Sequence, residues 1–172
     1  MGATTDQLKF IVQRYDSYIG GANTKGAFLL AFNSFVCGGL LSNYKSLAAF
    51  VEPGWITSYK LAVLGIFVLG VASLVVVLLA IFPFLKSGNS SPDRYHSLIY
   101  FGSVSMFDNS SKYREALNAL DEQAFNVDAS NQAFQLARGL RKKYYCLSWA
   151  TVLTFIQLVL ILGMLALILF TK

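Results

Sequence analysis

Charged residues are scarce in this sequence. Only 13% of its 172 residues are Asp, Glu, Lys or Arg, whereas about a quarter is usual in globular proteins. Hydrophobic residues make up 55%, and the mean hydropathy is +0.53. The chain has the length of one domain, but this composition argues against an ordinary soluble domain. It predicts an integral membrane protein with a modest polar portion.

Residues suited to catalysis or metal binding are also few. The single histidine, His96, has no nucleophile or carboxylate at a recognisable spacing and is interpreted as a structural residue. The two cysteines, Cys37 and Cys146, lie inside apolar segments without metal-ligand spacing and are interpreted as small hydrophobic residues. The sequence contains neither a phosphate-binding glycine loop nor a dinucleotide-binding glycine pattern. We therefore predict that the protein is not an enzyme, with no catalytic residue, no metal site and no cofactor.

Basic residues exceed acidic ones, and the formal net charge is +5. In a membrane protein such an excess mostly marks the cytoplasmic flanks of the spans. We therefore expect no nucleic-acid partner. Charged residues from Asp6 to Asp16 precede any long apolar run, so a cleaved signal peptide is not expected.

Three uncharged apolar runs are long enough to cross a bilayer. The first, 26–44, begins one residue after Lys25, whose ammonium is expected in the headgroup region. The second, 61–85, is rich in Val and Leu, and the third, 144–171, becomes almost purely aliphatic in its second half. The sequence thus predicts an all-α membrane protein with three transmembrane helices.

The cations that flank these spans orient them. Lys25, Lys86 and the run 141–143 must share one side of the membrane, and Lys and Arg favour the cytoplasmic side. The amino end is then cytoplasmic and the carboxyl end external. The connector 45–60, with its turn at Glu52-Pro53-Gly54, is predicted to be an external loop.

Residues 1–25 are predicted to form a cytoplasmic amphipathic helix, over residues 4–19. Two alternatives stay open for it: the helix lies on the inner membrane surface, or it packs on the other soluble parts of the chain. Gly20-Gly21 is predicted to form a bend or a hinge after this helix.

The segment 86–143 is predicted to be cytoplasmic and helical. Its apolar stretch 98–107 is too short to cross the membrane and is expected to be an interfacial or packed segment. Asn109-Ser110-Ser111 is predicted to cap a helix whose apolar face continues to Val127, with a break at 126–130. No helix-breaking residue separates the segment after this break from the third span. One long helix is therefore expected from near Asp128 through the bilayer.

Polar residues also occur inside the spans. Asn33 and Gln157 lie at membrane depth, where polar side chains usually face a neighbouring helix or a wet cavity. Gly38-Gly39 allows close helix approach. These residues predict that several copies of the chain pack together, and a homo-oligomer is expected.

The cytoplasmic part is rich in cations and aromatic rings, groups that bind a small anion and stack on a base. A simpler interpretation, which composition alone favours, is a basic membrane flank in contact with lipid headgroups. The residues considered are Arg94, Arg114, Arg138, Arg141, Lys142, Lys143, Lys25, Tyr95, Tyr100, Phe101 and Tyr113.

Five features occur along the chain in a set order. They are Ala22-Asn23-Thr24-Lys25-Gly26 before the first span, Pro83 at the end of the second, Tyr100-Phe101-Gly102, Gln132, and Lys143-Tyr144 before the third. In order and spacing, over nearly the whole chain, they resemble the transmembrane effectors of bacterial Pycsar antiphage systems, the PycTM family. Where that family often has an aspartate before its Thr-Lys pair, this chain has Asn23.

The resemblance implies a function that composition does not. Such effectors sense cyclic CMP or cyclic UMP, made by a partner cyclase during infection, and impair the bacterial inner membrane so that growth stops. It makes 86–143 the sensor region. The residues proposed for nucleotide binding are Arg94, Tyr100, Phe101, Gln132, Arg138 and Arg141, those proposed for coupling are Asn23, Thr24 and Lys25, and the polar residues inside the spans are Asn33 and Gln157. Two alternatives are a membrane effector gated by another nucleotide or by a partner protein, and a passive membrane scaffold.

Overall fold

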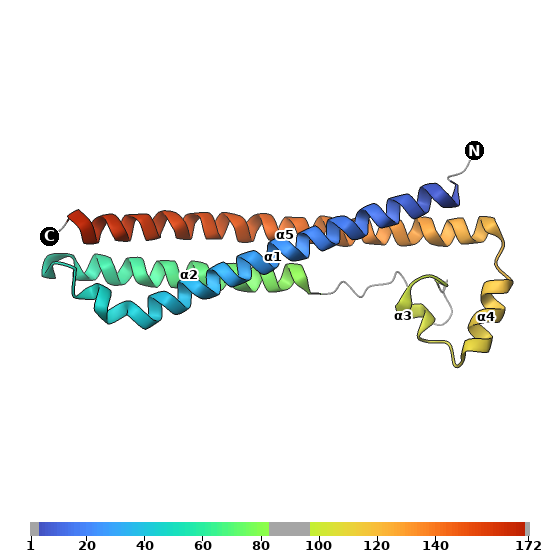
Figure 1. Cartoon of the computed structure of the whole chain (residues 1–172), viewed down its shortest axis with the longest axis horizontal. Helices are drawn as coiled ribbons and strands as arrows, with labels where there is room; N and C mark the ends of the chain where they lie inside the picture. The colour runs from blue at the N-terminus through green and yellow to red at the C-terminus, as the bar shows by residue number, and fades with distance from the viewer. Residues whose placement is uncertain (1–3, 83–96, 171–172) are drawn as a thin grey trace. The chain divides into compact units, whose positions relative to one another are not determined.

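The computed structural model describes residues 4–82 and 97–170. All regular secondary structure in this part of the chain is helical (Figure 1). The elements are α1 (Thr5–Ala48), the 3-10 turn η1 (Pro53–Trp55), α2 (Ile56–Ile81), α3 (Phe101–Val104), α4 (Ser110–Asn118) and α5 (Glu122–Phe170). Three stretches, α1, η1 with α2, and α5, are long and apolar enough to cross a membrane. The predicted all-α fold with three spans is confirmed.

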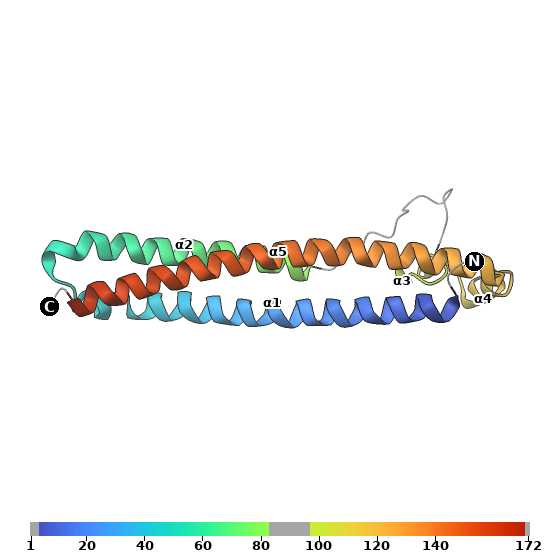
Figure 2. The same cartoon turned by 90° about the horizontal axis from the view of Figure 1, so that it is seen from above.

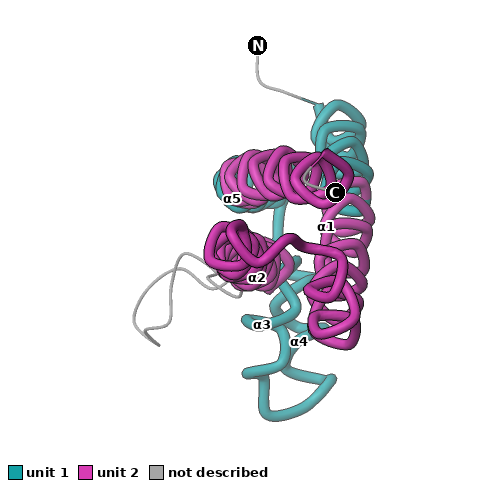
Figure 3. Tube along the Cα trace, turned by 90° about the vertical axis from the view of Figure 1, so that its left-hand side faces the viewer, with its two compact units in different colours: residues 1–20, 83–142 teal, residues 21–82, 143–172 magenta. Residues whose placement is uncertain are grey.

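The chain divides into two compact units, coloured in Figure 3. Unit 1 comprises residues 1–20 and 83–142, and unit 2 comprises 21–82 and 143–172. Helices α1 and α5 each contribute residues to both units.

Unit 2 is a bundle of three helical segments, taken from α1, α2 and α5 (Figure 2). An apolar cluster near the α1–α2 turn includes Tyr59, Ile66 and Met164, and a smaller one contains Ala22, Ala80 and Leu147. Many large apolar side chains point outward, and Phe28 is 73% exposed. This is the surface expected of helices that are solvated by lipid.

Helix α1 passes through Gly20-Gly21 without interruption, so the helix predicted over residues 4–19 does not end there. The boundary between the two units falls between these glycines, and a bend or hinge at this pair stays a prediction. A glycine costs about 1 kcal/mol relative to alanine in a helix interior, which long helical flanks on both sides tolerate. Nothing lies within 4 Å of a Cβ placed at either glycine. Neither residue is therefore needed for close packing.

The helices also take up most of the predicted connector 45–60. Helix α1 continues to Ala48 and α2 begins at Ile56, so only 49–55 separates them. At its other end α2 stops at Ile81. Phe82 has φ −50° and ψ 131°, the extended conformation favoured before a proline. The predicted end of the second span, Leu85, lies outside the described residues.

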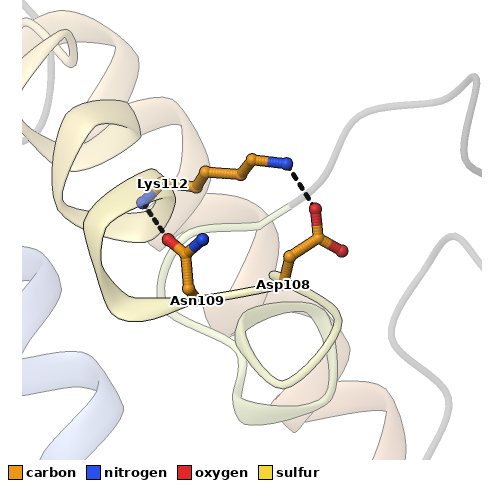
Figure 4. A network of polar contacts seen from close by, with 3 residues as sticks. All are labelled: Asp108, Asn109 and Lys112. Atoms are coloured by element: carbon orange, nitrogen blue, oxygen red, sulfur yellow. Dashed lines mark hydrogen bonds and ion pairs between the residues drawn. The ribbon is translucent and has the colours of Figure 1, made fainter.

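Unit 1 contains the predicted helix cap. The side chain of Asn109 accepts a hydrogen bond from the backbone N–H of Lys112 at 2.9 Å and caps α4 (Figure 4). The Lys112 ammonium also pairs with Asp108, and this hydrogen bond and charge hold the pKa of the Asp108 carboxyl below its usual value. Both side chains are exposed, so the pair adds little to stability.

The break between α4 and α5 lies earlier than predicted. Helix α4 ends at Asn118 and α5 begins at Glu122, whereas the predicted break at 126–130 is inside α5. The carboxylate of Asp121 accepts a hydrogen bond from the N–H of Ala124 at 2.6 Å, and this cap starts α5. The break divides the apolar face that was predicted to continue to Val127. The predicted uninterrupted helix from near Asp128 into the third span is confirmed.

Candidate functional site

Lys143, a residue of α5, extends its side chain to the carboxyl end of α2. Its ammonium donates to the backbone carbonyls of Ala80 at 2.8 Å and Ile81 at 3.3 Å, and to the side-chain oxygen of Asn23 at 3.1 Å. Carbonyls in the last turn of a helix lack intrahelical donors, and the helix dipole makes that end negative. Only 7% of Lys143 is exposed. The acceptors therefore offset the desolvation of a nearly buried charge.

A second lysine contacts the residue that follows Lys143. The Lys25 ammonium lies 5.7 Å from the ring centroid of Tyr144, the residue after Lys143, in a cation–π contact. One residue further along α1, a Cβ at Gly26 would lie 2.9 Å from Cδ1 of Ile81. The missing side chain lets α1 approach the end of α2. We call Asn23, Lys25, Lys143, Tyr144 and the carbonyls of Ala80 and Ile81 the lysine junction.

The lysine junction contains two of the three residues predicted to couple the sensor to the first span. Asn23 is the acceptor for Lys143, and Lys25 faces Tyr144. The third, Thr24, is exposed on α1. Sequence reasoning placed Lys143 among the flanking cations and missed its role as a cap.

Polar side chains meet again in the middle of unit 2. The amide nitrogen of Asn33 is 3.0 Å from the Thr154 hydroxyl and 3.3 Å from the Ser73 hydroxyl. The Ser73 hydroxyl in turn donates to the carbonyl of Ala150 at 3.1 Å. This layer draws one side chain from each of α1, α2 and α5.

A second polar layer lies next to the first along the helices. The amide nitrogen of Gln157 donates to the carbonyl of Ile66 at 3.2 Å. A Cβ at Gly70 would lie 2.5 Å from both the Cys37 sulfur and the Gln157 nitrogen, so the glycine admits them. We call these two layers the polar core, which consists of Asn33, Cys37, Gly70, Ser73, Thr154 and Gln157.

The polar core belongs to a single chain. Asn33 and Gln157 have no exposed surface, so the polar groups expected to bring copies together lie between helices of the same molecule. Cys37 is buried as a free thiol against the glycine, as a small hydrophobic residue would be.

In unit 1 a buried carboxylate holds the segment before α3. One oxygen of Asp128 accepts a hydrogen bond from the N–H of Leu98 at 2.8 Å, and the Tyr113 hydroxyl donates to the carbonyl of Leu98 at 2.9 Å. Asp128 is 2% exposed, and its other oxygen has no hydrogen-bond donor among the described residues. The apolar segment 98–107 is thus tied to α5.

The residues predicted to bind a nucleotide fall into separate groups. The rings of Tyr100 and Phe101 are 4.8 Å apart, and the Arg138 guanidinium lies 5.9 Å from the ring of Phe134. Arg138 and Arg141 are exposed, and Gln132 is half-buried. Within the described part of the chain, no hydrogen bond or ion pair joins these three to one another. Arg94, Tyr95 and His96 lie outside the described residues.

Comparison with known proteins decides which family these features belong to. The family model described as "PycTM: Pycsar effector protein domain" matches residues 7–170. The chain belongs to the Pycsar effector family. No curated protein and no solved structure matches it. The family and the three candidate spans make the protein a membrane effector of cyclic-nucleotide antiphage defence.

In this Pycsar effector the motifs separate between the units. The motif residues Asn23, Lys25, Lys143 and Tyr144 meet in the lysine junction of unit 2. Tyr100-Phe101-Gly102 and Gln132 belong to unit 1, and Pro83 lies outside the described residues. The junction therefore unites motifs that are far apart in the sequence.

Unit 1 of the effector also has a pocket of about 310 Å³. Its lining includes two carboxylates, those of Asp121 and Glu122, and none of the residues predicted to bind the nucleotide. Carboxylates repel an anionic phosphate. This pocket is therefore a poor place for the phosphate of a cyclic nucleotide. It is lined by Thr5, Leu117, Leu120, Asp121, Glu122 and Phe125.

Proposed function

We propose that this Pycsar effector senses cyclic CMP or cyclic UMP and then impairs the bacterial inner membrane, so that the infected cell stops growing or dies. The observation that carries the proposal is the family match over residues 7–170, on a chain with three helices able to span a bilayer. The nucleotide is a ligand made by a partner cyclase. No cofactor, no metal and no catalytic step is part of the proposal.

The proposed topology has the amino end in the cytoplasm and the carboxyl end outside. Lys25 precedes the first span, and Arg141 and Lys142 precede the third, where exposed cations favour the cytoplasmic side. Unit 1 is then cytoplasmic, where a soluble nucleotide reaches it. The turn at 49–55 is external, with Trp55 exposed beside it as an interfacial aromatic residue.

For recognition we propose that the exposed guanidinium groups of Arg138 and Arg141 hold the cyclic phosphate. An arginine suits this role because its planar donors pair with phosphate oxygens. Tyr100, Phe101 and Gln132 are proposed to contact the base, together with Arg94. The nucleotide activates the effector only if it binds the active arrangement more tightly than the resting one.

For coupling we propose the lysine junction. Helices α1 and α5 both pass from unit 1 into unit 2, and the junction residues lie where they enter unit 2. A change in α5 that moves Lys143 removes donors from the end of α2 and from Asn23 together. We further propose that the effector works as a homo-oligomer in the bilayer.

The proposed function is tested with liposomes that carry the purified protein and a potential-sensitive dye. Cyclic CMP, cyclic UMP and cyclic AMP are added separately, and empty liposomes serve as the control. Depolarisation by one cyclic pyrimidine nucleotide and not by cyclic AMP is the expected result. Silence with all three would contradict the proposal and favour an effector gated by a partner protein, or a scaffold.

A further inference from the structure

Two hydrogen-bond acceptors of the polar core lack a donor among the described residues. The Asn33 amide nitrogen lies within 3.3 Å of the Leu29 carbonyl and of two hydroxyls, which exceeds the hydrogens it carries. The side-chain oxygens of Asn33 and Gln157 are buried and have no hydrogen-bond partner among the described residues. A buried acceptor without a donor is unfavourable, and more so in lipid. Water molecules and small cations are the groups that bond to such buried oxygens.

The two layers lie between apolar clusters. On one side are Ala22, Ala80 and Leu147, and on the other are residues such as Leu40, Ile66 and Met164. The outer surfaces of the same helices are apolar, as Phe35, Leu78 and Leu162 show. The interior of unit 2 is therefore more polar in its middle than the surface that meets lipid.

The second layer closes only because Gly70 has no side chain. The Cys37 sulfur and the Gln157 amide occupy the space where a Cβ would lie, at 2.5 Å. A methyl group at this position forces the Cys37 thiol and the Gln157 amide to move, by rotation of these side chains or by displacement of α1 or α5 from α2. The three helices of unit 2 therefore meet tightly at this layer.

From these observations we propose that the polar core is the constriction at which a water-filled path for small ions opens through the interior of unit 2. In the closed arrangement the polar side chains bond to one another and to backbone carbonyls. In the open arrangement water forms hydrogen bonds with these polar side chains. The path then runs within one chain and not between copies. This proposal rests on the proposed membrane-impairing function and specifies where the membrane is breached.

The first test needs no nucleotide. The variant Gly70→Ala is reconstituted in liposomes, and the leak of potassium is compared with that of the wild type. We expect a leak at least about tenfold faster, the factor that a change of about 1.4 kcal/mol in the closed–open equilibrium gives. The matched control is Gly163→Ala, because nothing lies within 4 Å of a Cβ there. Equal and slow leaks from both variants, with native helicity, would overturn the proposal.

The second test uses Cys37 as a reporter. In a Cys146→Ala background Cys37 is the only thiol, and a membrane-impermeant methanethiosulfonate reagent reacts with it only where water reaches it. We expect mass spectrometry to detect rapid labelling of Cys37 in Gly70→Ala. We expect the same for the protein without the Gly70 substitution, once a cyclic pyrimidine nucleotide has depolarised its liposomes. Depolarised liposomes with unlabelled Cys37 would place the path elsewhere and refute the proposal, while leaving the proposed function intact.

If Gly70→Ala does not fold, Gln157→Ala replaces it, because removing that amide opens the same layer. A leak and a labelled Cys37 in this variant support the constriction, and a tight bilayer with unlabelled Cys37 refutes it. The two proposals can also fail separately. If a variant leaks and its Cys37 is labelled, but no cyclic nucleotide depolarises liposomes that carry the wild type, the constriction is supported and the proposed nucleotide response is contradicted.

Discussion

The ammonium of Lys143 donates a hydrogen bond to the side-chain oxygen of Asn23 over 3.1 Å, although 120 positions separate the two residues in the sequence. The same ammonium caps α2 through the carbonyls of Ala80 and Ile81. One nearly buried charge therefore joins all three helical segments of unit 2. The hydrogen bond joins the Asn-Thr-Lys motif before the first span to the Lys-Tyr pair before the third.

The first prediction concerns Lys143→Met, which removes the donors of the side chain and keeps most of its length. Two carbonyls and an amide oxygen lose their partner, so we expect the free energy of unfolding to fall by about 1–3 kcal/mol. Thermal unfolding in detergent, followed by circular dichroism, measures this. The matched control is Lys60→Met, because Lys60 is exposed on α2. Equal melting temperatures for the two variants would contradict the role of Lys143.

The second prediction concerns Asn23→Asp, which installs the residue that the family often has at this position. An aspartate there would pair with the Lys143 ammonium, and charge-assisted hydrogen bonds are stronger than neutral ones. We expect a higher melting temperature at neutral pH and a gain that disappears when Lys143→Met is added. In a double-mutant cycle, an undiminished gain in the Lys143→Met background would show that position 23 does not act through Lys143.

The third prediction concerns the contact of Lys25 with the ring of Tyr144. Because the contact is cation–π, Tyr144→Phe should keep it, whereas Tyr144→Leu should lose about 0.5–1 kcal/mol. We expect Lys25→Ala to abolish depolarisation of liposomes while the amount of protein in the membrane is unchanged. Tyr144→Leu should weaken depolarisation and Tyr144→Phe should leave it near the wild-type level. A full response from Lys25→Ala would exclude this residue from coupling.

The fourth prediction concerns Asp128, which accepts from the N–H of Leu98 inside unit 1. In Asp128→Ala that N–H loses its acceptor, which costs about 1–3 kcal/mol for a buried group. We expect faster hydrogen exchange at Leu98, while Asp128→Asn retains an acceptor and most of the protection. Ser130→Ala is the control, since the Ser130 hydroxyl bonds within α5, to the carbonyl of Val127. If the Leu98 amide is equally protected from hydrogen exchange in Asp128→Ala and in the wild type, the segment before α3 does not depend on this carboxylate.

The spans could be predicted because length and apolar composition alone decide whether a helix suits a bilayer. The errors fall at helix ends. The helix predicted over residues 4–19 does not end at Gly20-Gly21, since a long helix tolerates glycines. The start of α5 differs from the prediction because apolar residues continue at helical spacing on both sides of it. Only Asp121, the cap, followed by Glu122 marks the boundary in the sequence. Local capping decided that boundary, and hydrophobic spacing did not reveal it.

The candidate site was less predictable, because its contacts join distant parts of the sequence. Asn33 and Gln157 stood out as polar residues in apolar spans. Their partners Ser73 and Gly70 could not be read from the chain, since the register between α2 and the other helices is set by packing. The cap that Lys143 forms on α2 likewise depends on how the helices pack. A lysine beside a span predicts topology, and only the fold shows which helix end it reaches.

The last prediction concerns recognition of the cyclic phosphate by Arg138 and Arg141. Each is exposed on α5, and a hydrogen bond to a charged group contributes about 1.5–3 kcal/mol. We therefore expect Arg138→Ala or Arg141→Ala to weaken binding of the cyclic pyrimidine nucleotide at least about tenfold in calorimetry. Raising the salt concentration should reduce the difference, because exposed charges are screened. Arg114→Ala, on the exposed face of α4, is the control for a general loss of positive charge. An equal loss in all three variants would indicate attraction by net charge, and unchanged affinity in both Arg138→Ala and Arg141→Ala would remove these residues from the proposed site.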